Sequence, residues 1–190
     1  FNIDRGFVVG ERGFIARTEN RGINWTIVNS GEAVLDFNAI SFFEEAEGIV
    51  IGNGGFLARS TNGTNWTRVS ASTNANLRAI TMLDEQSAMV VGDQGIILKT
   101  SDRGITWNRI SSGYSADFTD VVFLDESVGF ITGKSGLMIR TFDGGATWER
   151  LDTGTFQDLT GLSFGDLNVG YAVGQNSLLF QYTCQVPVQP

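Results

Sequence analysis

The chain has 190 residues, of which 42% are hydrophobic, so it is long enough to bury a sizeable core. Its net charge of −8, with lysine only at Lys99 and Lys134 and with no histidine, excludes several classes of function. Such a surface repels phosphate backbones, so we expect no nucleic-acid partner, and the usual general base and the commonest zinc ligand are absent.

Tryptophans recur at an even spacing along the chain. Trp25, Trp66, Trp107 and Trp148 each stand 41 residues after the last. Glycine-rich strings recur with nearly the same period, at residues 8–18, 50–60, 90–100, 131–141 and 172–182. Because the third unit divides into four short, β-branched pieces at 77–83, 88–92, 95–100 and 106–111, the period indicates propeller blades of four strands, A to D.

The same division, followed in chain order, predicts the whole strand order. The chain begins at the end of an A strand and continues with B, C and D. Three complete blades follow, and then strands A, B and C of a fifth blade, ending near Thr183. No run approaches the roughly 20 apolar residues that a membrane-spanning helix needs, so the chain itself is not expected to be transmembrane.

The predicted fold is therefore an all-β propeller of about five four-stranded antiparallel blades over residues 1–183, with a tail at 184–190. Seven blades at this period would need about 290 residues, so the chain forms either a small ring of five or part of a larger, seven-bladed ring. We expect the closed ring of five, because an open arc leaves bare sheet edges. Cys184 is the single cysteine, so it cannot form an internal disulfide, and we expect no role for it.

The turn from strand C to strand D carries the sharpest motif, T-x-D-x-G-x-T-W. It is complete in the third and fourth copies and weaker in the first two, and its main positions are Asn20, Trp25, Asn62, Trp66, Asp102, Gly104, Trp107, Asp143, Gly145 and Trp148. An aspartate can accept hydrogen bonds from turn amides, and a tryptophan ring can pack between sheets. We expect the four tryptophans to be equally buried. We also expect Gly13, Gly55, Gly95 and Gly136 to take positive φ at the turns between strands B and C.

These motifs resemble the Asp-box, or bacterial neuraminidase repeat. The wider unit, with VG-x-x-G-x-I-x-x-T ahead of the box, looks more like the repeats of photosystem II stability and assembly factors. That resemblance implies a non-catalytic propeller in the thylakoid lumen, the periplasm or outside the cell. It also implies a protein partner, such as a membrane complex or its assembly intermediate, and no cofactor. The alternative is a secreted or cell-surface carbohydrate-binding or envelope-assembly module, because a fold alone does not transfer a role.

Two sets of residues are candidates for binding the partner. The first is a column of cations on strand C, Arg17, Arg59, Lys99 and Arg140, which either bind a carboxylate-bearing partner or pair with a neighbouring blade or the local box. The second is a pair of aromatics, Tyr114 and Phe156, in the variable loops between strands D and A. We expect recognition on the face of the B–C turns and D–A loops, where the cations contribute if their side chains reach it.

Each of the remaining polar features can be interpreted as structural or as functional. Acidic pairs such as Asp84-Glu85 recur once per blade, which favours solvated turns. Asn76, Asp117 and Asp158 stand just before strand A and are interpreted as turn caps. Arg78 and Asp120 depart from their columns and mark either a site or an ion pair in the channel. Sialidases of the Asp-box class need a tyrosine nucleophile in a matching motif, which Tyr114, Tyr171 and Tyr182 lack, so we expect no enzymatic activity.

Overall fold

The computed structural model of the chain describes residues 4–165 and 169–183. Cys184, the rest of the tail and Asp166, the acidic residue that follows strand A in the fifth unit, lie outside these residues. Within them the chain forms β-strands and three short 3-10 turns, with no α-helix. In chain order the elements are β1 (Gly6–Val9), η1 (Glu11–Gly13), β2 (Ile15–Thr18), β3 (Thr26–Val28), β4 (Phe37–Phe42), β5 (Gly48–Gly52), η2 (Asn53–Gly55), β6 (Leu57–Ser60), β7 (Thr67–Arg68), β8 (Leu77–Met82), β9 (Ala88–Gly92), η3 (Asp93–Gly95), β10 (Ile96–Thr100), β11 (Asn108–Ile110), β12 (Phe118–Phe123), β13 (Gly129–Gly133), β14 (Met138–Thr141), β15 (Glu149–Arg150), β16 (Leu159–Phe164), β17 (Val169–Gly174) and β18 (Leu179–Thr183).

The strands form five antiparallel sheets, which we number blades 1 to 5. Blades 2, 3 and 4 have four strands each, in the orders β4-β5-β6-β7, β8-β9-β10-β11 and β12-β13-β14-β15. Blade 1 has β1-β2-β3, which correspond to strands B, C and D, and blade 5 has β16-β17-β18, which correspond to A, B and C. This order confirms the strand assignment that the repeat predicts.

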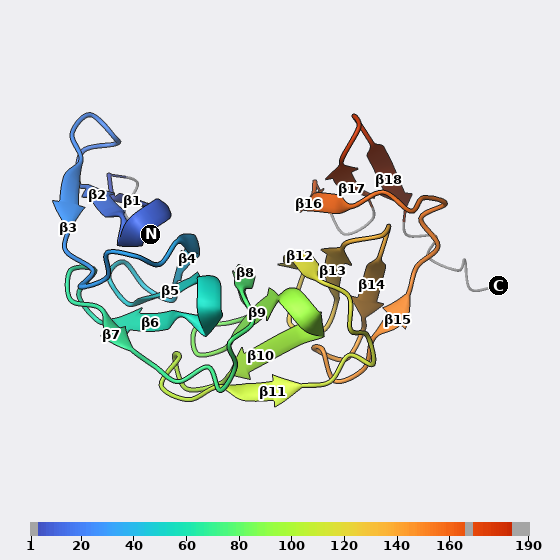
Figure 1. Cartoon of the computed structure of the whole chain (residues 1–190), viewed down its shortest axis with the longest axis horizontal. Coiled ribbons are helices and arrows are strands. Elements are labelled where there is room, and N and C mark those ends of the chain that lie inside the picture. Colours follow the sequence, from blue (N-terminus) through green and yellow to red (C-terminus); the bar gives the residue numbers. More distant parts are fainter. Residues whose placement is uncertain (1–3, 166–168, 184–190) are drawn as a thin grey trace.

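The blades stand side by side around a common axis and form an open arc (Figure 1). An opening separates blade 1 from blade 5, so the expectation of a closed ring of five is wrong, whereas the alternative of part of a larger ring is consistent with the arc. The curvature comes from the way neighbouring blades pack, face on face, and this packing is similar at each junction. A repeat period in the sequence specifies the blade but does not specify the angle between blades.

The hydrophobic core is divided among the junctions between blades. Between blades 2 and 3, Ile51 and Leu57 pack with Val90 and Leu98, and all four are at most 2% exposed. Equivalent clusters fill the other three junctions. Strand β9 is buried at every residue, because both of its faces are covered by neighbouring blades.

The tryptophans are not buried equally, which corrects the sequence prediction. Trp66, Trp107 and Trp148 are half-buried, and each packs against the junction with the preceding blade. Trp25 is exposed, because no blade among the described residues covers the side of blade 1 on which it stands. In blade 5, which has no box, the ring of Tyr182 stands against Phe164 with centroids 6.0 Å apart, much as Trp148 stands 6.2 Å from Phe123 in blade 4.

The turns between strands B and C confirm the glycine prediction. Gly13, Gly55, Gly95 and Gly136 have φ of 70°, 71°, 68° and 68°. At Gly55 a Cβ atom would lie 1.9 Å from the carbonyl oxygen of Thr73, so the turn excludes any side chain there. The residue before this glycine also has positive φ. At Gly54 an added Cβ atom would meet open space, and the equivalent residues of blades 1, 3 and 4 are Arg12, Gln94 and Ser135.

Candidate functional site

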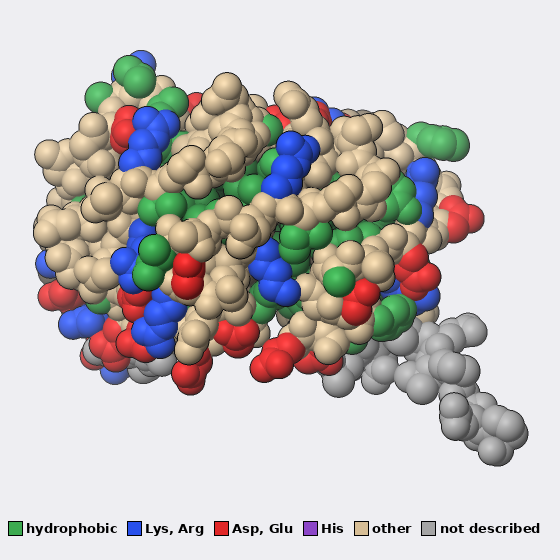
Figure 2. Space-filling model, turned by 90° about the horizontal axis from the view of Figure 1, so that it is seen from below, with side chains coloured by type: hydrophobic (Ala, Val, Ile, Leu, Met, Phe, Trp, Pro, Cys, Tyr) green, Lys and Arg blue, Asp and Glu red, His purple; other side chains and the backbone are tan. Residues whose placement is uncertain are grey.

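The blades present two loop faces to solvent. The box face carries the A–B loops and the C–D turns, and the turn face carries the B–C turns and the D–A loops. Figure 2 views the outer strands on the convex side of the arc, and most of the acidic side chains visible there gather along one edge. The two faces differ in what their polar groups are bonded to, and this difference bears on function.

On the box face, the motif aspartates are saturated by their own turns. Asp102 accepts hydrogen bonds from the backbone amide of Thr106 at 2.9 Å and from the hydroxyls of Thr106 and Thr100 at 2.6 and 2.7 Å. Burial raises the pKa of Asp102, but these hydrogen bonds together outweigh it and lower the pKa to about 2. Trp107 donates its indole N–H to the carbonyl of Gly104 at 3.2 Å. The aspartate and the tryptophan of the box therefore bond within their own turn.

The cation column bonds between blades. Arg59 donates to the carbonyl of Arg103 at 2.8 Å, and Lys99 donates to the carbonyl of Gly144 at 2.9 Å. Both carbonyls occupy the same position in the box of the next blade. Arg140 donates instead to the hydroxyl of Tyr182 at 2.8 Å, because blade 5 has no box.

These contacts support the structural reading of the column. Arg17, in blade 1, pairs with Glu19 at 3.8 Å. The four cations stand near the C-terminal ends of their strands, at the box face, and they do not come together with Tyr114 and Phe156 on the turn face. The structure thus separates the two sets of candidate residues.

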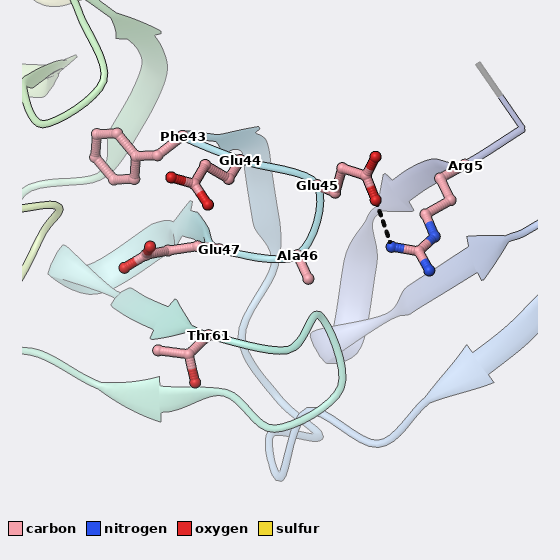
Figure 3. A pocket seen from close by; sticks show the side chains of 7 residues that line it. All are labelled: Arg5, Phe43, Glu44, Glu45, Ala46, Glu47 and Thr61. Atoms are coloured by element: carbon pink, nitrogen blue, oxygen red, sulfur yellow. Dashed lines mark hydrogen bonds and ion pairs between the residues drawn. The ribbon is translucent and has the colours of Figure 1, made fainter. Parts of the chain in front are cut away.

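A cavity of about 540 Å³ opens on the box face between blades 1 and 2 (Figure 3). Glutamates line it, and cations pair with them. Arg103 reaches Glu44 at 2.8 Å and Glu47 at 2.9 Å, Glu47 also pairs with Arg59, and Arg5 lies 3.0 Å from Glu45. The sequence reading missed Glu47, although it stands where the next two copies have Ser87 and Val128. Elsewhere the A–B acids, such as Asp84, accept hydrogen bonds from backbone amides of their own turns.

On the turn face, each D–A loop is tied to the preceding blade. The side chain of the residue just before strand A accepts a hydrogen bond, at 2.9 to 3.1 Å, from the backbone amide of the positive-φ residue in the B–C turn of the preceding blade. The pairs are Asp36 with Arg12, Asn76 with Gly54, Asp117 with Gln94 and Asp158 with Ser135. The turn-cap interpretation is confirmed, and each cap acts across a junction.

Nearer the axis, the turn face holds a polar cavity of about 420 Å³, which we call the axial mouth. Its lining comes from blades 2 to 5, and its members are Asn38, Arg78, Asp93, Asp117, Thr119, Lys134, Asp158, Thr160 and Gln175. Arg78 forms a two-point ion pair with Asp93, at 2.8 and 2.7 Å, and Lys134 lies 2.7 Å from Asp117. The hydrogen bond from Arg78 lowers the pKa of Asp93, and that from Lys134 lowers the pKa of Asp117.

The two exceptional residues of the inner strand therefore differ. Arg78 is half of an ion pair that borders the axial mouth. Asp120 accepts backbone hydrogen bonds from Val121 and, across the junction, from Leu162, at 2.9 and 2.8 Å, and burial raises its pKa. No grouping of side chains suited to hold a metal ion occurs among residues 4–165 and 169–183.

The tips of the D–A loops carry the apolar groups of the turn face. Phe156 is 89% exposed, and Val34, at the same register in the loop between blades 1 and 2, is exposed as well. Tyr114 is half-buried, because its ring packs against the core between blades 3 and 4. The two exposed anchors thus lie on loops near the two ends of the arc, with the polar axial mouth on the same face.

Five antiparallel blades, the first four of which carry Asp-box turns, define a β-propeller of the Asp-box repeat class. The family model described as photosynthesis system II assembly factor YCF48 matches residues 1–113 and 105–184, and the chain belongs to this family. No curated protein matches the chain. Within the described residues, no helix is both long enough and apolar enough to span a membrane.

Solved structures agree on the fold. YCF48 from Cyanidioschyzon merolae is 21% identical with a TM-score of 0.73, over 95% of this chain and 66% of that one. The GH74 enzyme of Niastella koreensis is 14% identical with a TM-score of 0.79, over 95% and 34%. The Cps50 (Swd1) β-propeller domain of Myceliophteria thermophila is 9% identical with a TM-score of 0.76, over 97% and 68%. At these identities the likeness shows the fold alone, and the chain spans 66% of the length of the YCF48 protein.

Proposed function

We propose that this chain is a non-catalytic scaffold that binds another protein during the assembly of a membrane complex, in an extracytoplasmic compartment. The family description names an assembly factor, and a rigid array of blades suits that role. The observation that carries the proposal further is the exposure of the D–A loops on the turn face. Phe156 and Val34 are 89% and 83% exposed there, more than Ile23, Ile105 or Phe142 on the box face.

The proposed contact surface lies on the turn face. Phe156 and Val34 supply apolar contact from the D–A loops, and the exposed edge of Tyr114 adds to it. At the axial mouth, Arg78 and Lys134 pair with aspartates but keep 37% and 51% of their side chains exposed, so each offers hydrogen-bond donors to a partner. Aromatic and arginine side chains dominate the energetics of most interfaces. Arg59, Lys99 and Arg140 support binding indirectly, by holding neighbouring blades together, whereas Arg17 pairs within blade 1.

The absence of catalysis is part of the same proposal. Catalytic carboxylates and tyrosines need an activating partner and a free approach for the substrate. Among the described residues, the carboxylates of the axial mouth are bonded to cations, side-chain amides or turn amides, and those around Glu47 are paired with arginines. The similarity to the GH74 enzyme is one of fold and identifies no active-site residue in this chain.

Site-specific photocrosslinking tests the proposal. A benzophenone side chain at Phe156 reports on the turn face, and the same group at Phe142, which is also exposed, serves as the matched control on the box face. With detergent-solubilised membranes from the source organism, we expect crosslinks to a subunit of a membrane complex from position 156 and not from 142. Phe156→Ala should then weaken binding by about 1–2 kcal/mol. Crosslinks from position 142 alone would show that the face is wrongly assigned, and retention on glycans would favour the carbohydrate-binding alternative.

A further inference from the structure

The axial mouth is built on a side-chain pair that recurs from blade to blade. In blades 2 to 5 the cap residue just before strand A bonds to the first residue of the following B–C turn, 17 positions later. The pairs are Asp36 with Asn53, Asn76 with Asp93, Asp117 with Lys134 and Asp158 with Gln175. In blades 3, 4 and 5 these pairs reach the lining of the cavity, beside the inner strands β8, β12 and β16, which stand nearest the axis (Figure 1).

The lining of the axial mouth carries more negative than positive charge. Its carboxylates are Asp93, Asp117 and Asp158, and its cations are Arg78 and Lys134. The hydrogen bond to Asp117 raises the pKa of Lys134, and the charges of Asp93 and Asp158 raise it further from a longer distance. These groups therefore act on one another as a single unit, and three carboxylates against two cations leave it with a net charge of −1.

Asp158 is the carboxylate that no cation neutralises. Within residues 4–165 and 169–183 it accepts hydrogen bonds from two amides, the backbone of Ser135 at 2.9 Å and the side chain of Gln175 at 3.3 Å. No residue outside these ranges is lysine or arginine. The hydroxyl of Thr160 donates to the carbonyl of Val173 at 3.4 Å, so its oxygen can still accept. Blade 5 thus lines the cavity with three oxygen acceptors, from Asp158, Thr160 and Gln175.

We propose that the axial mouth takes one lysine or arginine side chain of the partner, with its charge against Asp158. A carboxylate and two neutral oxygens suit the three N–H groups of an ammonium or the fork of a guanidinium. The described carboxylates are not grouped as a metal ion requires, which favours an organic cation. This inference rests on the proposed function, because it takes the occupant of the cavity to be a protein.

The loop that carries Asp158 indicates which residues accompany the cation. Phe156 stands two positions earlier and is 89% exposed, so a partner that contacts it brings neighbouring side chains to the cavity. From blades 3 and 4, Arg78 and Lys134 offer N–H groups that suit backbone carbonyl oxygens of the same segment. The expected element of the partner is therefore an extended segment in which a basic residue lies beside an apolar one.

Nuclear magnetic resonance on the isotope-labelled full chain tests the inference with three short peptides. The probes are acetyl-leucyl-lysyl-leucine amide and its two counterparts with norleucine or glutamate in place of the lysine. The signals to follow are the backbone amide of Ser135 and the side-chain amide of Gln175, because both donate to Asp158. We expect the lysine peptide alone to shift these signals in a saturable way.

Two substitutions change the charge of the cavity in opposite directions, and each introduces a residue that a neighbouring blade already has at that position. Asp158→Asn removes a negative charge, and Asn76 shows that asparagine caps the same turn. Lys134→Gln removes a positive charge and copies Gln175. We expect the dissociation constant of the lysine peptide to rise about fivefold in the first variant and to fall about twofold in the second. Asp152→Asn, which changes an exposed acid of the same loop, is the matched control and should leave this constant unchanged.

The peptides also give the results that would overturn the inference. A shift with the glutamate peptide in place of the lysine peptide shows that the cavity recognises the opposite charge, and an equal shift with the norleucine peptide shows that charge plays no part. The absence of any saturable shift overturns the inference as well. If position 156 still crosslinks to a membrane-complex subunit in that case, the proposed function stands and this inference alone fails. A response to the lysine peptide without a crosslink from position 156 refutes the proposed function, and with it the assignment of the cation to a protein.

Discussion

Two adjacent glycines in one turn should respond very differently to the same substitution. Gly54 and Gly55 both have positive φ, 64° and 71°, so alanine costs about 1–2 kcal/mol of backbone strain at either position. At Gly54 nothing lies within 4 Å of the added Cβ, and the reduced entropy of the unfolded chain returns about 0.4–1 kcal/mol. We therefore expect Gly54→Ala to destabilise the protein by about 1 kcal/mol or less.

At Gly55 the added Cβ would lie 1.9 Å from the carbonyl oxygen of Thr73 and 2.8 Å from its carbon. Both are backbone atoms of the D–A loop, so relief requires the loop to move, and this displaces the cap between Asn76 and Gly54. Such overpacking typically adds about 1–3 kcal/mol, so we expect a total of about 3 kcal/mol or more.

Equilibrium unfolding in urea, followed by tryptophan fluorescence and checked by calorimetry, measures both values. The checks matter because repeat proteins can depart from two-state behaviour. If the two variants differ by less than about 0.5 kcal/mol, the clash with Thr73 is not what fixes glycine at this position. The contrast is informative because the other copies already carry Arg12, Gln94 and Ser135 at the tolerant position.

Three further outcomes are expected. Trp107→Ala should cost about 2–3 kcal/mol, below the range for a fully buried aromatic, and Trp25→Ala about 1 kcal/mol, both measured by urea unfolding; equal losses would contradict the exposure of Trp25. Hydrogen bonds from Thr147 lower the pKa of Asp143 to about 2, below its ordinary value of 3.8, so its contribution to stability is complete above about pH 4 and is lost as the pH falls toward 2. Melting temperatures recorded across this range should therefore fall less steeply for Asp143→Asn than for the unmodified chain. Tyr182→Phe, which removes the acceptor for Arg140, should destabilise the protein by about 1 kcal/mol in the same unfolding assay, and an unchanged stability would show that this hydroxyl does not help to hold blade 5.

The strand order was predictable because its signals are local. The tryptophans and the glycines of the B–C turns recur at fixed places in the first four copies, so the strand order can be followed from residue types along the sequence. The caps at Asn76, Asp117 and Asp158 were predictable because short polar residues recur at one register just before strand A, although the hydrogen bonds that they accept cross a junction between blades. The sequence did not predict that the arc is open, because this depends on the angle at which neighbouring blades pack, and no single residue type encodes that angle.

The candidate site was predictable only in part. Phe156 was singled out from its loop, and it is exposed. Tyr114 was chosen by the same reasoning, but its ring has a core to pack against, which the loop sequence alone does not reveal. The loop face that the cation column reaches depends on the end of strand C at which its residues stand. Glu47 pairs with Arg59 of its own unit and with Arg103 of the next unit, and a contact between two units cannot be recognised from one repeat.

The caps on the turn face have an evolutionary consequence. Each one joins an acceptor in one unit to a donor in the unit before it, and the cations of β6 and β10 likewise reach forward to the next box. A gene duplication that inserts one whole unit therefore brings one half of each bond and meets the other half in its neighbours. Gain or loss of a whole copy therefore leaves these bonds paired at the internal junctions, so a chain built this way can change its number of blades by a single genetic step.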